Sequence, residues 1–159
     1  MDPLGSGSFG QALKCLDHKT NELVALKIIK NQKKFQYQAG MELKIIKFLN
    51  NHDKQDVNNI IRVKDYCIFR EHLVIVFELL NLNLYEFIKK NEFKGLTQNL
   101  IRRFAIQMLQ ALRYQHQHDL VHCDLKPENI LLKQENKSGI KIIDYGSSCF
   151  IGQRIYTYI

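Results

Sequence analysis

The segment that most constrains this chain is residues 121–132, VHCDLKPENILL, which sets several kinds of polar chemistry between apolar anchors. A carboxylate, an ammonium, a carboxamide and a proline fall within the six positions from Asp124 to Asn129. Asp124 can accept a hydroxyl proton, Lys126 can neutralise a phosphate, and Asn129 offers an oxygen ligand to magnesium. The sequence therefore predicts a loop that is held by a core at both ends and is suited to phosphoryl transfer.

The composition is that of one folded domain. The chain has 159 residues, 45% of them hydrophobic, and can bury roughly two thirds of its unfolded surface. No run of about 18 apolar residues occurs and no basic region precedes an apolar core, so we expect no transmembrane helix, signal peptide or membrane partner. The cysteines lack paired metal-ligand spacing, which indicates reduced thiols and an intracellular location, in the cytoplasm or nucleus. They are Cys15, Cys67, Cys123 and Cys149.

The formal charge of +7 raises the question of nucleic-acid binding. The 23 basic residues are spread along the chain, and clusters such as 30–34 and 102–103 fall on faces that we expect to be solvated. No aromatic residues interleave with them as platforms for stacked bases. We therefore expect no nucleic-acid partner, although the positive field would still favour an anionic nucleotide.

Residues 5–10, GSGSFG, form a G-x-G-x-x-G pattern that is a weak signal by itself, because dinucleotide-binding folds also use it. A dinucleotide fingerprint should open a helix, whereas here both flanking segments look like strands. A glycine-rich hairpin allows backbone amides to close over phosphates without obstruction by side chains. A flexible glycine turn remains the simpler interpretation of the motif taken alone.

Lys27 lies within the apolar strand predicted for residues 23–30, where a lysine is costly unless an anion meets its ammonium group. Glu42 is a candidate partner on the helix that follows, although a solvated carboxylate is the alternative for it. Gly40 within that helix costs up to about 1 kcal/mol, which predicts close packing or a later helix start. The helix itself is predicted by apolar residues at one-face spacing, Met41, Leu43, Ile45, Ile46 and Leu49.

Two further strands are predicted for residues 63–69 and 72–80. Residues 78–81, ELLN, end the second of these strands and lead into a short helix-like stretch. We expect a hinge between two lobes there, with backbone groups that could bind an adenine edge. A plain connection between a strand and a helix is the alternative.

A core helix is predicted for residues 97–118, with Thr97 as its amino-terminal cap. We expect His116 and His118 at its end to be solvated, since no cysteine or acid nearby completes a metal site. The predicted stripe is Leu100, Phe104, Met108 and Leu112, with Ile101, Ala105 and Leu109 beside it.

The run IKIIDYGSS, residues 140–148, delivers Asp144 to a glycine turn twenty positions after Asp124. Asp144 can then face Asn129 across a magnesium ion, which prefers carboxylate and carboxamide oxygens. A hairpin turn is the alternative for a lone aspartate before glycine. The order of the four motifs along the chain favours the metal site.

Taken together, these motifs resemble those of eukaryotic protein kinases and, within them, the dual-specificity tyrosine-regulated kinases. The resemblance implies an α+β, protein-kinase-like fold. In that fold a small β-sheet lobe with one helix (about 1–78) and a hinge (79–82) precede the first part of a mainly helical large lobe (83–159). The sequences that carry the resemblance are HCDLKPENILL, with Cys123 where most kinases have arginine, GIKIIDYGSSC, VALKIIKN and QRIYTYI.

The resemblance also implies ATP and Mg²⁺ as cofactors and serine or threonine residues of protein substrates as acceptors. Asp124 would be the catalytic base, Lys126 would contact the transferred phosphate, and Asn129 and Asp144 would hold magnesium. Tyr158 would be the autophosphorylated residue of the activation loop. The nucleotide-binding residues would be Gly5, Ser6, Gly7, Ser8, Phe9, Gly10, Ala12, Lys27, Glu42, Phe77, Glu78 and Leu80.

The chain departs from the family pattern in three ways. Tyr145 replaces the usual phenylalanine, so its hydroxyl needs a partner if it is buried. Ala12 replaces a valine that packs over adenine, which removes about 1 to 2 kcal/mol of apolar contact. The sequence ends at Ile159, so we expect an exposed hydrophobic patch and a chain that is inactive alone. The alternative function is an inactive nucleotide-binding or interaction module, and the oligomeric state is not predicted.

Overall fold

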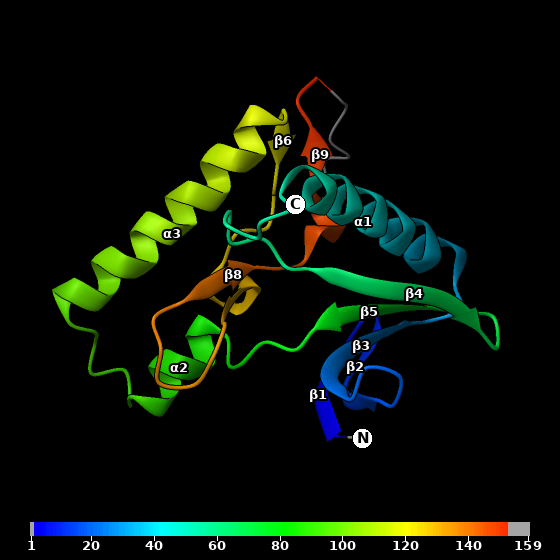
Figure 1. The fold of residues 1–159 in the computed structure, drawn as a ribbon, viewed down its shortest axis with the longest axis horizontal. Coiled ribbons are helices and arrows are strands. Elements are labelled where there is room, and N and C mark those ends of the chain that lie inside the picture. Colours follow the sequence, from blue (N-terminus) through cyan, green and yellow to red (C-terminus); the bar gives the residue numbers. More distant parts are fainter. Residues whose placement is uncertain (1, 153–159) are drawn as a thin grey trace.

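The structure, a computed structural model, describes residues 2–152 and combines an antiparallel sheet with a mainly helical part (Figure 1). The sheet has five strands in the order β1-β2-β3-β5-β4. The α+β class predicted from the sequence is confirmed. The strands are β1 (Asp2–Gly7), β2 (Gly10–Asp17), β3 (Glu22–Ile29), β4 (Val63–Phe69) and β5 (His72–Glu78).

Local turn chemistry sets the register of these strands. Between β2 and β3, the Asp17 carboxylate accepts hydrogen bonds from the Lys19 amide at 2.8 Å and the Thr20 hydroxyl at 3.0 Å. Between β4 and β5, Arg70 and Glu71 both have positive φ, of 46° and 66°. Two such residues make the tight turn whose twist matches an antiparallel hairpin. The strands that flank the candidate site are therefore fixed locally.

One long helix, α1 (Lys33–His52), packs against β3, β4 and β5 (Figure 1). Its predicted apolar face is buried except for Met41, which is partly exposed. The same core continues through Ile75 and Phe77 of β5 to Tyr114 and Ile142 of the helical part. Burying each large apolar side chain stabilises the fold by about 1.5 to 3 kcal/mol. The buried residues of this face are Ala39, Leu43, Ile45, Ile46 and Leu49.

The expectation for Gly40 is wrong on both counts. The helix starts seven residues earlier, at Lys33, and a Cβ atom built on Gly40 meets no heavy atom of the described residues within 4 Å. Neither close packing nor a late start accounts for this glycine.

The helical part contains α2 (Leu84–Lys90) and α3 (Gln98–Gln117). Thr97 caps α3, since its hydroxyl accepts the Leu100 amide at 3.4 Å. Phe104 is buried with Leu100 and Met108 packed beside it. The three residues predicted beside the stripe are exposed, Ile101 by 51% and Leu109 by 65%, together with Ala105. The reason is that α3 meets the rest of the described chain on one narrow face. His118 packs edge-on against His52 at a ring distance of 5.1 Å, so it is not simply solvated.

Two short β-pairs hold the loops of the helical part. β7 (Ile130–Leu132) pairs with β8 (Ile140–Ile142), and β6 (Leu120–Val121) pairs with β9 (Cys149–Phe150). The loops between them contain two 3₁₀ turns, η1 (Pro127–Asn129) and η2 (Tyr145–Ser147). Residues 124–129 are thus anchored at both ends, as the sequence predicted.

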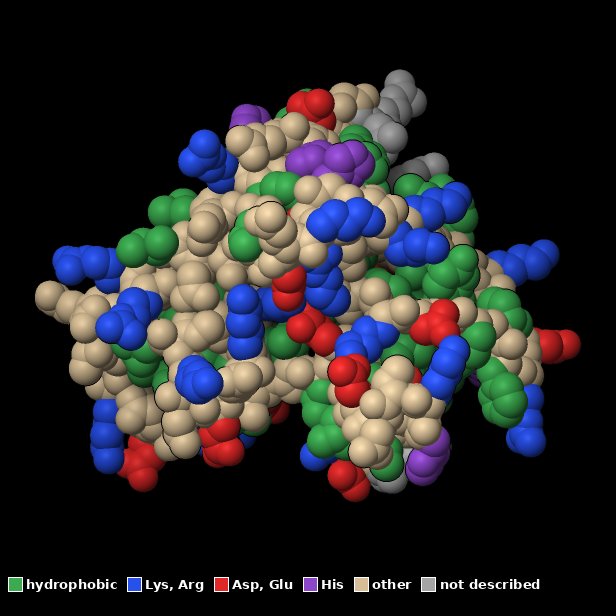
Figure 2. Space-filling view, in the orientation of Figure 1, with side chains coloured by type: hydrophobic (Ala, Val, Ile, Leu, Met, Phe, Trp, Pro, Cys, Tyr) green, Lys and Arg blue, Asp and Glu red, His purple; other side chains and the backbone are tan. Residues whose placement is uncertain are grey.

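Basic side chains are distributed rather than gathered on the face shown in Figure 2, where they alternate with acidic and apolar groups. Within residues 2–152, no helix is both long enough and apolar enough to cross a membrane.

Candidate active site

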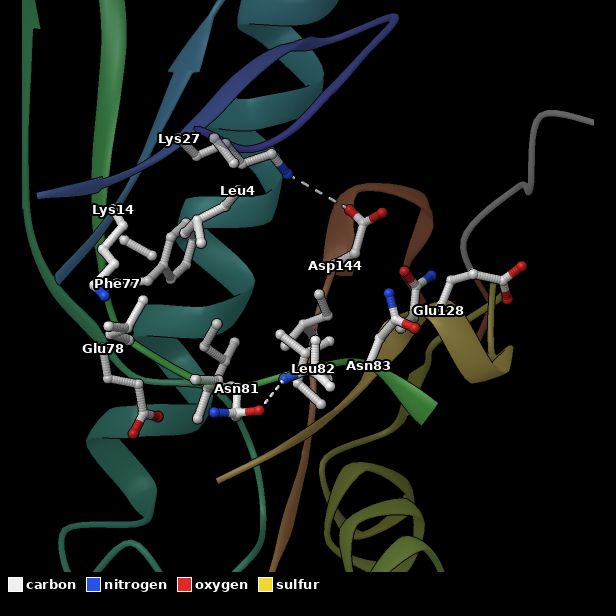
Figure 3. A pocket seen from close by; sticks show the side chains of 18 of the residues that line it. Leu4, Lys14, Lys27, Phe77, Glu78, Asn81, Leu82, Asn83, Glu128 and Asp144 are labelled. Carbon is white, nitrogen blue, oxygen red and sulfur yellow. Dashed lines mark hydrogen bonds and ion pairs between the residues drawn. The ribbon is translucent and has the colours of Figure 1, made fainter. Parts of the chain in front are cut away.

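A cavity of about 570 Å³ lies where the sheet meets the helical part (Figure 3). Its walls come from β2 and β3, from the connection between β5 and α2, and from the segments around β7 and Asp144. A smaller cavity of about 270 Å³ adjoins it and is lined by Lys27, Asp124, Lys126 and Asp144. Of the residues predicted from the sequence, the first cavity is lined by Phe9, Ala12, Lys27, Glu42, Phe77, Glu78, Leu80, Asn129 and Asp144.

The glycine motif forms the predicted hairpin, with Gly7 paired to Gly10 and a turn at residues 8–9. Phe9 lines both cavities and Ser8 lines the smaller one. Gly5, Ser6, Gly7 and Gly10 do not line either cavity and form the strands behind this turn. They therefore frame the turn whose residues Ser8 and Phe9 border the smaller cavity.

Gly10 cannot be replaced without moving this hairpin. Its φ is 152°, and an added Cβ would lie 1.9 Å from the Ile28 carbonyl oxygen. We expect Gly10→Ala to destabilise the β2–β3 pairing by about 1 to 3 kcal/mol and to weaken nucleotide binding. Thermal unfolding with and without Mg-ATP measures both effects.

Gly5→Ala is the matched control for this prediction, because no described atom lies within 4 Å of a Cβ at Gly5. Equal melting temperatures and equal ATP protection in the two variants would contradict the close approach at Gly10.

Lys27 on β3 is paired with Glu42 on α1. Its Nζ lies 2.7 Å and 2.9 Å from the two carboxylate oxygens of Glu42, and 3.6 Å from Asp144 Oδ1. Glu42 is 3% exposed, and burial raises the pKa of its carboxyl while Lys27 opposes that shift. The same Nζ lies 4.7 Å from the centre of the Phe9 ring. The predicted partner of the strand lysine is therefore present, and the pair faces the cavity.

The loop at residues 124–129 organises its polar groups around Asp124. Lys126 Nζ lies 2.9 Å and 3.1 Å from the Asp124 carboxylate oxygens, and this hydrogen bond raises the pKa of Lys126. Asn129 donates from Nδ2 to the Asp124 carbonyl at 2.8 Å and to its carboxylate at 3.1 Å. Because these bonds use the amide donors, the Asn129 side-chain oxygen is left as an acceptor.

Asp144 follows β8 and has a left-handed backbone, with φ of 62°. Such a conformation is uncommon for a non-glycine residue and tends to occur at functional sites. Asp144 and Asn129 line the same cavity and offer the carboxylate and carboxamide oxygens that Mg²⁺ prefers. Among the described residues, no group of three or more His, Cys, Asp or Glu side chains could hold a metal. These two residues fit a magnesium ion that completes its shell with phosphate and water oxygens.

The hydroxyl of Tyr145, the first departure from the family pattern, is hydrogen-bonded. Its hydroxyl accepts a hydrogen bond from Gln115 Nε2 on α3 at 3.0 Å, and its ring packs edge-on against His122 at 4.9 Å. Tyr145 is fully buried, which raises the pKa of its hydroxyl well above the usual value. Gln115 was not predicted as a partner, although it is a polar residue next to the apolar stripe of a core helix.

This pair makes a prediction that a double-mutant cycle can test. Tyr145→Phe removes the acceptor of Gln115 Nε2, so that neither polar atom of this buried amide keeps a partner among the described residues, and should lower the free energy of unfolding by about 1 to 3 kcal/mol. Adding Gln115→Leu removes both polar partners, so the double variant should recover much of that loss. Denaturant unfolding measures the four proteins, and strictly additive losses would contradict the pairing.

The connection after β5 forms the wall of the cavity opposite Asp144 (Figure 3). Phe77 is buried in the core, and Leu80 borders the cavity. Glu78 also borders it, but its carboxylate bonds to the Arg62 amide at 2.8 Å and to Lys141 Nζ at 2.6 Å. Neither of these partners lines the cavity, so Oε1 of Glu78 is bonded outside it.

Cys123 and Cys149, beside the two aspartates, have sulfur atoms 3.6 Å apart and are both free thiols. Burial is the main cause of the raised pKa of Cys149, and the Cys123 thiol adds to it. Tyr158, the predicted phosphorylation site, lies outside the described residues.

The structure thus joins an antiparallel sheet with one helix, through a short connection, to a helical part that supplies the polar loops of the cavity. A family model described as protein kinase domain matches residues 1–158, and the chain belongs to this family. The predicted protein-kinase-like fold is thereby confirmed.

Curated relatives of this chain are dual-specificity tyrosine-phosphorylation-regulated kinases, which confirms the resemblance. A Drosophila melanogaster protein named as a putative dual specificity tyrosine-phosphorylation-regulated kinase 3 homolog is 57% identical to this chain over 156 residues. These residues cover 98% of this chain and 19% of the relative. Human kinase 4 is 51% identical over 159 residues, all of this chain and 31% of the relative. Drosophila kinase 2 is 52% identical over 159 residues, all of this chain and 22% of the relative. The chain thus spans less than a third of each.

Proposed function

We propose that this domain transfers the γ-phosphoryl group of ATP to serine or threonine residues of protein substrates. The observation that carries the proposal is the convergence of side chains on the two adjoining cavities. The Lys27–Glu42 pair comes from the sheet and α1, while Asp124, Lys126 and Asp144 come from loops of the helical part. Phosphoryl transfer depends on such positioning and charge stabilisation more than on covalent chemistry by the protein.

Each of these residues has a role that its geometry supports. Asp124 is exposed enough to meet a substrate hydroxyl and would accept its proton. Lys126, bonded to Asp124, would balance charge on the transferred phosphate, and Lys27 would bind the other phosphates. Asn129 and Asp144 would hold Mg²⁺, which when bound supplies neutralisation of phosphate charge.

The adenine would occupy the larger cavity. Ala12 from β2 would cover it, Phe77 would close its inner end, and the backbone at Glu78 and Leu80 would hydrogen-bond its edge. The glycine hairpin would form the lid over the phosphates. In this proposal the small lobe covers about residues 1–78, the hinge 79–82 and the large lobe 83–159.

Further parts of the proposal concern regulation and location. Tyr158 would be autophosphorylated, in keeping with the dual specificity in the names of the relatives. The four free cysteines favour an intracellular location, in the cytoplasm or nucleus. The partners would be ATP and protein substrates, with no nucleic acid or membrane.

Transfer of ³²P from γ-labelled ATP to a protein substrate tests the proposal, with Asp124→Asn as the control in the full protein. We expect the variant to lose at least about 100-fold in rate, because proton transfer in the transition state is lost. Phosphoamino-acid analysis should find serine or threonine in the substrate and tyrosine in the enzyme. Equal labelling by both proteins would overturn the proposal, and Mg-ATP binding without Asp124-dependent transfer would favour the non-catalytic module.

A further inference from the structure

Lys141 is a buried cation that none of the roles above uses. It lies in the middle of β8, three residues before Asp144, and its side chain is 1% exposed. The residues on either side of it, Ile140 and Ile142, belong to the apolar core. A lysine in this position is strongly unfavourable unless its charge and its three donors are satisfied.

Two carboxylates from different segments satisfy Lys141. Its Nζ lies 2.7 Å and 2.8 Å from the oxygens of Asp56, in the loop between α1 and β4, and 2.6 Å from Glu78 Oε1 at the end of β5. Arg62 joins the same cluster, because its Nε lies 3.0 Å from Asp56 and its amide donates to Glu78 at 2.8 Å. Arg62 Nη2 also lies 3.7 Å from Asp53 Oδ2, so two cations meet three carboxylates in one network.

Backbone hydrogen bonds connect the same three segments: the loop after α1, the end of β5 and β8. The Ile61 amide donates to the Ile142 carbonyl at 3.1 Å, and the Ile142 amide donates to the Asn59 carbonyl at 2.9 Å. The Glu78 amide donates to the Arg62 carbonyl at 3.1 Å. The loop after α1 is therefore tied both to the strand that leads to Asp144 and to the strand that leads into the hinge.

We propose that Lys141 is a positioning residue for the nucleotide. By bridging Glu78 and Asp56 behind the cavity, it fixes the end of β5 against β8 and so holds the hinge backbone in the orientation that binds adenine. The inference rests on the proposed ATP-dependent transfer and adds to it a residue that does not touch the ligand.

The expected kinetic signature follows from where the network lies. The adenine edge is remote from the reacting phosphate, so contacts to it are equally strong in the ground state and the transition state. Loosening these contacts raises the KM for ATP and leaves kcat little changed. A purely structural role would instead reduce the folded, active fraction and hence the apparent kcat at an unchanged KM.

Steady-state phosphoryl transfer by the full protein tests this inference for Lys141→Met, with Lys137→Met as the control, because Lys137 is exposed on the connection that leads into β8. Losing a charged hydrogen bond at Glu78 should raise the KM for ATP about tenfold in Lys141→Met. We expect kcat to stay within about threefold of wild type, and both constants to be unchanged in Lys137→Met.

Glu78→Gln keeps the acceptor for the Arg62 amide but removes one of the two negative charges that Lys141 meets, so it tests the inference if Lys141→Met does not fold. It should raise the KM for ATP about threefold. An active wild type with an unchanged KM in the folded variants would overturn this inference alone. A wild type without Asp124-dependent transfer would overturn the proposed function, and the inference with it.

Discussion

Replacing Lys27 with methionine should lower kcat for phosphoryl transfer by about 10²- to 10³-fold, the usual effect of removing one preorganised charge from a reaction site. Lys27 is suited to this role because both carboxylate oxygens of Glu42 bond to its ammonium group, at 2.7 Å and 2.9 Å. Methionine keeps most of the aliphatic side chain but removes Nζ, and with it the bonds to Glu42 and the contact with the Phe9 ring, so we expect losses in both rate and nucleotide affinity. Steady-state transfer and calorimetric titration with Mg-ATP measure both.

Lys19→Met, on the exposed turn between β2 and β3, is the matched control and should behave as wild type. Glu42→Gln should give a smaller loss than Lys27→Met, since it removes the partner and not the cation. Transfer by Lys27→Met at a rate within a few-fold of wild type would contradict the role of the pair.

Asp144→Asn should be nearly as damaging, again by about 10²- to 10³-fold in kcat, because it removes the one carboxylate of the proposed metal pair. The magnesium concentration that gives half-maximal activity should rise in this variant. Nucleotide affinity should lose most of its dependence on magnesium, which titration of bound nucleotide with the metal measures without any turnover.

Asp65→Asn on β4 is the control for this prediction, because an asparagine there can still accept the Tyr66 amide. An Asp144→Asn protein with the magnesium dependence of wild type would contradict the assignment of Asp144 as a ligand.

The sequence predicted the parts of this fold that local patterns determine. The hairpin at residues 5–10 and the strand around Lys27 follow from glycine positions and apolar runs, and the cap at Thr97 follows from its place before a helical stripe. Gly40 and the exposed Ile101 and Leu109 were less predictable. Whether such residues are packed depends on which segments lie opposite, and periodicity within one helix does not contain that information.

Two contacts behind the candidate site were missed for a different reason. Lys141 has the same signal as Lys27, a lysine inside an apolar strand, and the same argument would have predicted a buried anionic partner for it. Gln115 lies in a helix whose apolar stripe was enough to predict that the helix is buried, so the pattern drew no attention to this polar residue. In both cases the partner is distant in sequence: 63 residues separate Lys141 from Glu78, and 30 separate Gln115 from Tyr145. The local sequence pattern could therefore indicate that a buried polar group needs a partner, but not which residue that partner is.

The central claim is that Lys27, Asp124, Asn129 and Asp144 meet around one magnesium-bound triphosphate. A crystal structure of the protein with Mg²⁺ and a non-hydrolysable ATP analogue tests this most directly. We predict Mg²⁺ at about 2.0 to 2.1 Å from side-chain oxygens of Asn129 and Asp144, with the terminal phosphate beside Asp124. A triphosphate bound outside this cavity, or a magnesium ion held without these two residues, would contradict the account.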